Sequence, residues 1–229
     1  TVVNFGGANG KAQQKAYIEP FEKSGGAKVT MVEYNGEQAK IKAMVEAKKV
    51  IWDVVEVESP DINRGCDEGL FEKLDWAKVG NKADFQKAAV HECGVGTFVW
   101  STVMAYDGDK LKTAPTTWAD FWDVKKFPGK RAMYKWGAGM WEALLLGDGV
   151  AAADLYPLDI ERAHKKLAGF KENVVAYWGG GSESQSLLLN GDASMALIWS
   201  TRARLIEQDS GGDIKFIWDQ GLIAPGSMA

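Results

Sequence analysis

The stretch GDASMALIWSTRAR, residues 191–204, indicates how this chain folds. It opens on a Gly-Asp turn signal, and the mostly apolar residues Ser194–Trp199 that follow predict a short buried strand. Ser200 and Thr201 are residue types that often cap helices, and the apolar-periodic run Ala203–Ile206 predicts a helix directly behind them. The stretch therefore predicts a strand that leads straight into a helix.

Arg202 falls in the first turn of this predicted helix, where the helix dipole disfavours a cation. An arginine in such a position often has another role, and binding a carboxylate is the obvious one. The backbone N–H groups of the same turn would help to hold the anion. The alternative is an arginine that pairs with a neighbouring Asp or Glu on the surface, and this stretch alone leaves both interpretations open.

The 229 residues are 46% hydrophobic and 25% charged, with a net charge of −4. These values are those of an ordinary globular chain of one large or two medium domains.

No apolar run approaches the ~18 residues that a membrane helix needs. No basic segment precedes an apolar one at the start, so the sequence shows no signal peptide, and a mature secreted chain would also show none. The mild acidity argues against a nucleic-acid partner, which would select a basic patch.

The first 70 residues alternate strand and helix patterns. They predict strands at 2–5, 28–34 and 53–57 and helices at 13–23 and 37–47. This order favours a parallel sheet with crossover helices. We expect turn-rich loops at 6–10 and 58–61. The first of them lacks the glycine spacing of a phosphate-binding P-loop, and Ala12 stands where that motif needs Ser or Thr.

The longest strand pattern, GVGTFVWSTVMAY at 94–106, has the length of a strand that passes between two domains. The second half repeats the α/β pattern, with helices predicted at 117–123, 138–147, 159–170 and 183–189 and strands at 131–135, 174–178, 215–218 and 222–224. Gly179–Ser182 is expected to be a flexible entry to a helix. We therefore expect a first lobe at 1–105, a second lobe at 106–224, and the start of a return crossing at 225–229.

Ten tryptophans are a high number for this length. Trp52 and Trp118 have apolar neighbours and are expected in the core. Five others stand at predicted strand or loop ends, where the ligand pockets of α/β sheets open; they are Trp100, Trp136, Trp178, Trp199 and Trp218. Aromatic walls suit cationic ligands through cation–π attraction.

Two cysteines, Cys66 and Cys93, and only two histidines do not make a good zinc site. The cysteines form one disulfide if the compartment is oxidising, and otherwise they are two buried thiols. His91 near Cys93 is the one candidate nucleophile pair, but it has no orienting third group. The chain also has no Gly-x-Ser-x-Gly motif around Ser182 and Ser184. We therefore expect no enzymatic activity and no catalytic residue.

Five stretches carry a resemblance to a known family. They are WDVVEVESPDINRGCDEGLFEKLDW (52–76), GTFVWSTVMAYD (96–107), PTTWADFWDVKKFPGKRAMYKWG (115–137), YPLDIERAHKKL (156–167) and GDASMALIWSTRAR (191–204). In them the chain resembles the periplasmic substrate-binding proteins of bacterial ABC importers, in the branch that carries spermidine, putrescine and related amino compounds.

The resemblance implies an α/β fold of the type II-like periplasmic-binding-protein class, with two lobes joined by crossing strands and the ligand in the cleft between them. It also implies a periplasmic location, an ABC permease in the inner membrane as partner, a monomer, and neither cofactor nor metal. The oxidising periplasm favours the disulfide between Cys66 and Cys93. Family members have mature chains of about 300 residues or more, so we expect that the C-terminal part of the first lobe is missing here.

Polyamine-binding members of this family use aromatic walls and acidic residues, and Trp199, Trp218 and Asp219 fall where such contacts are expected. Arg202 departs from that pattern, because two like charges at ~4 Å and an effective dielectric of ~20 repel by about 4 kcal/mol. The sequence WSTR is similar to the branch that binds γ-aminobutyrate. We therefore expect an ω-amino acid, with its carboxylate on Arg202 and its ammonium on Asp219.

Further ligand contacts are expected from loop positions. They are Asn9, Glu58, Ser59, Phe98, Ser101, Trp136, Glu183 and Gln185. The plain alternatives are an ordinary helix-start acid for Glu183 and core packing for Phe98 and Trp136. Two other functions stay open at this point: a putrescine or spermidine binder, and a ligand-sensing fragment of an engineered biosensor built on the same fold.

Overall fold

The computed structural model describes residues 1–229, which form two compact units. Unit 1 comprises Thr1–Trp100 and Ala224–Ala229, and unit 2 comprises Ser101–Ile223. The chain passes from unit 1 to unit 2 within one long strand, β4 (Val95–Asp107), and returns within another, β8 (Ile214–Met228). The boundaries expected from the sequence, after residues 105 and 224, fall in these same two strands. A membrane-crossing helix is not among the elements, since none is both long enough and apolar enough.

Unit 1 is built from short strands and the helices between them. In chain order its elements are β1 (Val2–Asn4), α1 (Gly7–Gln13), a π-helical turn (Gln14–Ile18), α2 (Glu19–Lys23), β2 (Met31–Glu33), α3 (Gln38–Glu46), β3 (Val54–Glu58), α4 (Ser59–Asp67), α5 (Trp76–Val79) and two 3-10 turns (Lys82–Asp84, Lys87–Ala89). Strand β1 pairs in parallel with β2 and β3, and the end of β8 pairs antiparallel with β3.

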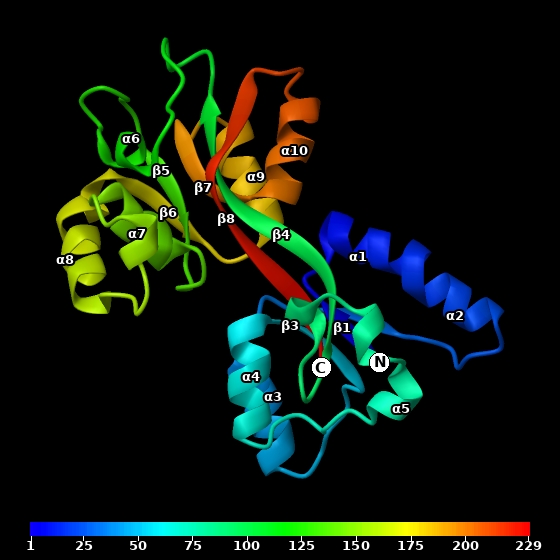
Figure 1. Ribbon diagram of the computed structural model, residues 1–229. Coiled ribbons are helices and arrows are strands. Elements are labelled where there is room, and N and C mark those ends of the chain that lie inside the picture. Colours follow the sequence, from blue (N-terminus) through cyan, green and yellow to red (C-terminus); the bar gives the residue numbers. More distant parts are fainter. The chain divides into compact units, whose positions relative to one another are not determined.

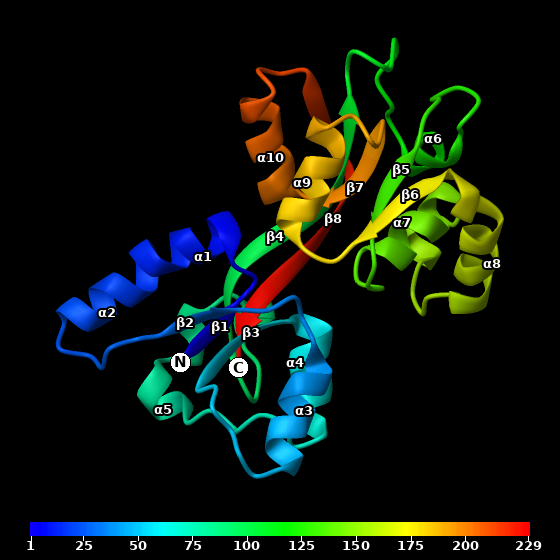
Figure 2. The ribbon, with the colours of Figure 1, turned by 180° about the vertical axis from the view of Figure 1, so that it is seen from behind.

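The helices of unit 1 cover both faces of this sheet (Figures 1 and 2). The strand order is β2-β1-β3, so the chain moves one way through α1 and α2 and the opposite way through α3. Right-handed crossovers then place α1 and α2 on one face and α3 on the other. The small core of the unit lies between these layers and is made of Val3, Tyr34, Ile41, Val55, Val57 and Ile62.

Cys66 and Cys93 are joined by a disulfide in unit 1, with a Cα–Cα distance of 5.7 Å and a sequence separation of 27. The expected disulfide is therefore confirmed, and no free cysteine is left. Because Cys93 is oxidised, the alternative of two buried thiols is wrong. For the same reason Cys93 cannot act as a nucleophile with His91.

Unit 2 continues β4 and adds three parallel strands. Its other elements are α6 (Trp118–Trp122), β5 (Arg131–Tyr134), α7 (Met140–Gly147), a 3-10 turn (Ala152–Asp154), α8 (Ile160–Phe170), a second 3-10 turn (Lys171–Asn173), β6 (Val174–Trp178), α9 (Gly181–Leu189), β7 (Met195–Trp199), α10 (Ser200–Asp209) and most of β8. Strand β5 pairs in parallel with β6 and β7, and β4 pairs antiparallel with β7.

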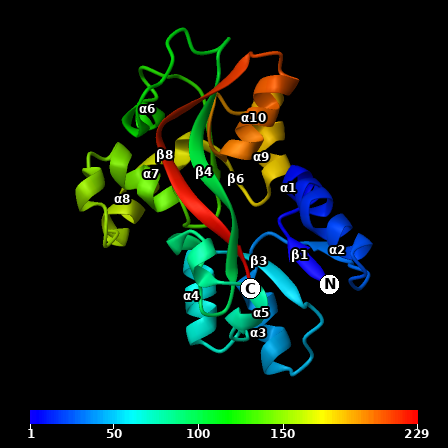
Figure 3. The same cartoon turned by 45° about the vertical axis from the view of Figure 1, so that its right-hand side comes forward.

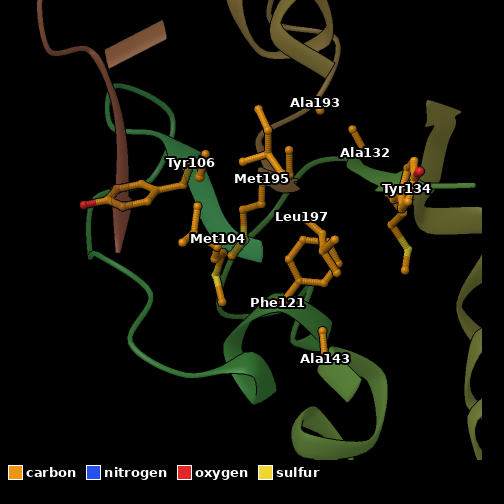
Figure 4. Packing of buried hydrophobic residues seen from close by; sticks show 14 of the residues in the cluster. Met104, Tyr106, Phe121, Ala132, Tyr134, Ala143, Ala193, Met195 and Leu197 are labelled. Carbon is orange, nitrogen blue, oxygen red and sulfur yellow. The ribbon is translucent and has the colours of Figure 1, made fainter. Parts of the chain in front are cut away.

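The helices of unit 2 lie on opposite sides of its sheet, with α7 and α8 on one side and α9 and α10 together on the other (Figures 1 and 3). This follows from the strand order β7-β5-β6, because the chain moves from β5 out to β6 and then back past β5 to β7. The core of the unit lies mainly under α6 and α7, where Met104 and Leu197 lie close to Phe121 and Ala143 (Figure 4).

Arg131, the first residue of β5, is fully buried in unit 2. Its guanidinium donates hydrogen bonds to the carbonyl oxygens of Phe121 (2.8 Å), Phe127 (2.7 Å) and Gly129 (2.6 Å). Burial lowers the pKa of Arg131 to about 10, which leaves the side chain a cation at neutral pH. This arginine therefore holds the loop before β5 and is structural.

Two stretches expected to be loops are helical instead. Helix α1 already begins at Gly7, after Gly6 with a φ of 63°, and the turn-forming composition of 6–10 conceals this start. Helix α4 begins at Ser59, directly after β3. Its Pro60 stands in the first helical turn, where a missing N–H costs nothing, so the proline does not mark a loop here.

Three further expectations are corrected in unit 2. The N-cap of α10 is Trp199, so Ser200 and Thr201 are helical residues and not caps. Helix α9 begins at Gly181, inside the stretch expected to be flexible. The strands expected at 215–218 and 222–224 are one strand, β8, because Gln220 adopts a φ of 60° and the strand continues through this irregular position.

Candidate ligand-binding residues

Three aromatic side chains meet at the carboxyl edge of the sheet in unit 2. Tyr134, Trp178 and Trp199 are the last residues of the parallel strands β5, β6 and β7. The ring centroids are 4.6 Å apart for Tyr134–Trp178, 5.3 Å for Tyr134–Trp199 and 5.1 Å for Trp178–Trp199. We call these three residues the aromatic triad. They lie at the carboxyl edge of a parallel sheet, which is the usual place for a ligand in α/β folds.

The aromatic triad holds Trp199 in a defined orientation. Trp178 is 0% exposed, and its Nε1 donates to the carbonyl oxygen of Leu197 at 3.1 Å. The ring of Trp178 meets that of Trp199 at 89°, an edge-to-face arrangement that aromatic pairs prefer. Trp199 itself is half-buried, so it keeps an exposed part beside the two rings that hold it.

Arg202 is the third residue of α10 and is only 5% exposed. Its burial shows that it is not a surface arginine, which the alternative interpretation requires, and its role as a ligand contact stays a prediction. Its Nη1 lies 3.5 Å from Oε1 of Gln185 on α9, and its side chain also lies against Gly181 at the start of that helix. The guanidinium therefore stands beside the N-terminal turns of α9 and α10, and both helix dipoles favour an anion there.

Two of the other predicted residues in unit 2 have internal partners. The Glu183 carboxylate accepts a hydrogen bond of 2.8 Å from the backbone N–H of Gly179, and this bond fixes the glycine-rich entry to α9. The backbone N–H of Ser101 donates to Oγ of Ser200 at 3.2 Å, and this bond ties β4 to the start of α10.

Three predicted residues of unit 2 are exposed. Trp136 follows β5 and is 43% exposed, with Nζ of Lys135 5.0 Å from the centre of its ring. Trp218 on β8 is 63% exposed and packs on Phe216 at 5.1 Å between ring centroids. Asp219 is the exposed residue next to it.

The backbone that carries Asp219 is held from its other side. The neighbouring Gln220 accepts hydrogen bonds from Trp118, at 2.8 Å from the backbone N–H to Oε1 and at 2.8 Å from Nε1 to the carbonyl oxygen. Trp118 is almost fully buried, so this irregular point of β8 is anchored in the core. Asp219 is thus an exposed carboxylate on a fixed backbone.

The carboxyl edge of the sheet in unit 1 carries acidic groups. Glu58 ends β3, and its carboxylate accepts a hydrogen bond of 2.8 Å from Nε1 of Trp100. Burial raises the pKa of Glu58 to about 8, and the nearby carboxylates of Glu56 and Asp61 act in the same direction. A cation close to Glu58 would favour the charged form of this carboxyl group and would lower its raised pKa.

Asn9 belongs to a buried hydrogen-bond network in unit 1. Its Nδ2 donates to both carboxylate oxygens of Glu56, at 2.9 and 3.0 Å, and Nε2 of Gln13 donates to the same carboxylate at 2.6 Å. The hydroxyl of Tyr34 donates to the carbonyl oxygen of Glu56. Burial raises the pKa of Glu56 despite these donors. The network gives Asn9 a structural role in the first turn of α1.

The remaining predicted residues of unit 1 lie near the return of β8. Oγ of Ser59, the first residue of α4, donates to the carbonyl oxygen of Pro225 at 3.3 Å. The ring of Phe98 lies against Gly226, where a Cβ would lie 2.6 Å from Cε1 of the ring. Both contacts connect the last strand to unit 1, and Phe98 remains half-buried.

The sequence pattern of the bacterial extracellular solute-binding proteins matches residues 16–228. This chain belongs to that family. The family resemblance drawn from the five quoted stretches is thereby confirmed. Solved structures of the same kind superpose on the whole chain, which also confirms the expected two-lobed periplasmic-binding-protein fold.

Individual relatives differ in how closely they match this solute-binding protein. A gamma-aminobutyric acid-binding protein of Pseudomonas aeruginosa is 48% identical over 230 residues, or 98% of this chain and 65% of that protein. A solved structure described as a GABA receptor is 39% identical, with a TM-score of 0.87, over 100% of this chain and 70% of the other. The spermidine/putrescine-binding periplasmic protein of Escherichia coli K12 is 21% identical over 209 residues, or 88% of this chain and 59% of that protein. This chain thus spans less than two thirds of the length of these two curated relatives.

Sequence reasoning missed two residues at the carboxyl edge of unit 2, Tyr134 and Gly181. Tyr134 ends a strand that the sequence did predict, so its place at a strand end was an available signal. The sequence predicts a flexible loop at Gly181, and only the fold brings this residue against Arg202. In unit 1 the sequence pointed to Glu58 but not to its hydrogen bond with Trp100, which comes from a strand 42 residues away.

Proposed function

We propose that this solute-binding protein binds a small ω-amino acid, with γ-aminobutyrate as the first candidate. Arg202 is the observation that carries the proposal. A buried guanidinium beside two helix N-terminal turns supplies the positive field that a ligand carboxylate requires. The 48% identity to a gamma-aminobutyric acid-binding protein supports the same ligand.

The other end of such a ligand is an ammonium group on a short apolar chain. We assign Trp199 to this chain and to cation–π attraction, because the aromatic triad holds its ring in place. We assign Asp219, with Trp218 beside it, to the ammonium, because its carboxylate is exposed on an anchored backbone. The supporting contacts that we propose are Asn9, Glu58, Ser59, Phe98, Ser101, Trp136, Glu183 and Gln185.

A polyamine is the weaker candidate ligand. Putrescine and spermidine carry only positive charges, which the guanidinium of Arg202 would repel. The polyamine-binding relative is also only 21% identical. In the proposed role the protein is a periplasmic monomer that delivers its ligand to an ABC permease in the inner membrane and catalyses no reaction.

A thermal-shift titration tests the proposed ligand. The protein is heated with γ-aminobutyrate, putrescine or spermidine, each at several concentrations. A ligand at 100 times its Kd stabilises the folded state by about 2.7 kcal/mol, which gives a readily measured rise in Tm. Two variants complete the experiment: Arg202→Ala, and Arg204→Ala as the matched control, because Arg204 is an exposed arginine on the same helix.

We expect γ-aminobutyrate to raise the Tm of the wild type and of Arg204→Ala, and to leave that of Arg202→Ala unchanged. A rise with putrescine or spermidine alone would contradict the proposal and favour the polyamine-binding alternative. An equal rise for both arginine variants would remove Arg202 from the site.

A further inference from the structure

Helix α9 presents one face to the side chain of Arg202. Gly181 is the first residue of this helix and Gln185 stands four residues later, so the two lie on the same face, one turn apart. Both touch the same guanidinium, Gly181 by close packing and Gln185 through Oε1 at 3.5 Å from Nη1. The side chain of Arg202 is therefore supported along one full turn of a neighbouring helix.

The contact at Gly181 depends on the absence of a side chain. A Cβ at this position would overlap Nε of Arg202 and would lie 2.8 Å from Cζ, closer than real Cβ atoms come to other heavy atoms. The backbone of Gly181 does not have a positive φ, so an alanine is compatible with its conformation. Helix formation also favours alanine over glycine. What glycine provides here is space for the guanidinium.

We propose that Gly181 and Gln185 are positioning residues that set where the guanidinium of Arg202 stands, and thereby which length of ω-amino acid the protein prefers. The proposal rests on the proposed function, because it takes Arg202 as the carboxylate-binding group. A ligand of fixed length is held at both ends, so moving one charged anchor by a fraction of an ångström changes which chain length fits. Gln185 supports the guanidinium through its neutral amide oxygen Oε1.

Gly181→Ala is the variant that tests this role, and Gly169→Ala is its matched control. Gly169 is also a helical glycine, on α8, but a Cβ there meets no heavy atom within 4 Å. Both variants gain helix propensity, and only the first one displaces Arg202. The measurements are the Tm without ligand and the Kd values for β-alanine, γ-aminobutyrate and 5-aminovalerate by calorimetry.

We expect Gly181→Ala to keep a ligand-free Tm equal to or above that of the wild type and to bind γ-aminobutyrate roughly tenfold or more weakly. Its preference among the three chain lengths should also change, whereas Gly169→Ala should keep the wild-type values. Equal Kd ratios in all three proteins would overturn the proposal. A lower ligand-free Tm with a uniform loss for every ligand would also overturn it, because a structural role alone would then explain the result.

A second readout does not require a ligand. The Nε–H resonance of Arg202, assigned by its loss in Arg202→Lys, reports the surroundings of the guanidinium in NMR spectra. We expect it to shift in Gly181→Ala and to stay in place in Gly169→Ala, and an unchanged resonance in both would overturn the positioning role. Wild-type protein that binds no ω-amino acid would contradict the proposed function, while this resonance would still decide whether Gly181 positions Arg202.

Discussion

The indole Nε1 of Trp100 donates a hydrogen bond of 2.8 Å to the carboxylate of Glu58, at the end of β3. This is the one donor that lowers the pKa of Glu58, and burial outweighs it, so the pKa rises from an ordinary 4.5 to about 8. A carboxyl group with a raised folded-state pKa binds its proton more tightly in the folded state than in the unfolded state. Its contribution to stability is therefore complete below pH 4.5 and is lost as the pH rises towards 8 and beyond.

The Glu58→Gln variant should remove this loss, because a glutamine stays neutral at every pH. Relative to the wild type, we expect its Tm to rise steadily between pH 5 and pH 8 and to differ little at pH 4. Thermal unfolding of both proteins across this range checks the prediction. Glu46→Gln, at an exposed position on α3 in the same unit, is the control. A Tm difference that is the same at all pH values would contradict the raised pKa of Glu58.

Truncation to alanine should lower the free energy of unfolding strongly at Trp178 and hardly at all at Trp218. Trp178 is 0% exposed and supports the ring of Trp199, so Trp178→Ala should cost about 3–5 kcal/mol of unfolding free energy. Trp218 is 63% exposed, so Trp218→Ala should change that free energy by no more than about 0.5 kcal/mol. Urea unfolding of the three proteins measures both values. A large loss in Trp218→Ala would mean that its ring is part of the core.

Reduction of the disulfide should destabilise unit 1. The bond between Cys66 and Cys93 closes a loop with a sequence separation of 27, for which chain entropy predicts a stabilisation of about 3.5 kcal/mol. We expect a lower Tm for the protein in dithiothreitol and for the double variant Cys66→Ala, Cys93→Ala, and no further effect of dithiothreitol on that variant. Equal Tm values with and without the reductant would show that the bond does not contribute to stability.

The sequence predicts most regular elements because their apolar patterns are local. Strand β6 has the bounds that the pattern at 174–178 indicates, and the long strand-like run at 94–106 marks β4 nearly to the residue. The errors come where turn-forming residues occur inside regular structure. Pro60 stands in the first turn of α4 and Gln220 lies within β8, so local composition suggested a loop at one place and a break at the other.

The candidate site was predictable only in part. Arg202 and Trp199 are adjacent in the sequence to a recognisable strand–helix junction, so the stretch itself identifies them. The aromatic triad depends on β5 lying between β6 and β7, and no local pattern states that order. The same is true of the contact between Gly181 and Arg202, because it requires α9 and α10 to lie side by side on one face of the sheet.

The measurement that tests the central claim most directly is the coupling between Arg202 and the carboxylate of the ligand. Calorimetry gives the Kd of γ-aminobutyrate and of its carboxamide, 4-aminobutanamide, for the wild type and for Arg202→Ala, with Arg204→Ala as control. If Arg202 binds the carboxylate, the wild type and the control should prefer γ-aminobutyrate by about 30-fold or more, because a buried charge pair that loses one partner costs roughly 2 kcal/mol at least. Arg202→Ala should show little preference between the two ligands. An undiminished preference in Arg202→Ala, with its folding confirmed by circular dichroism, would contradict the account.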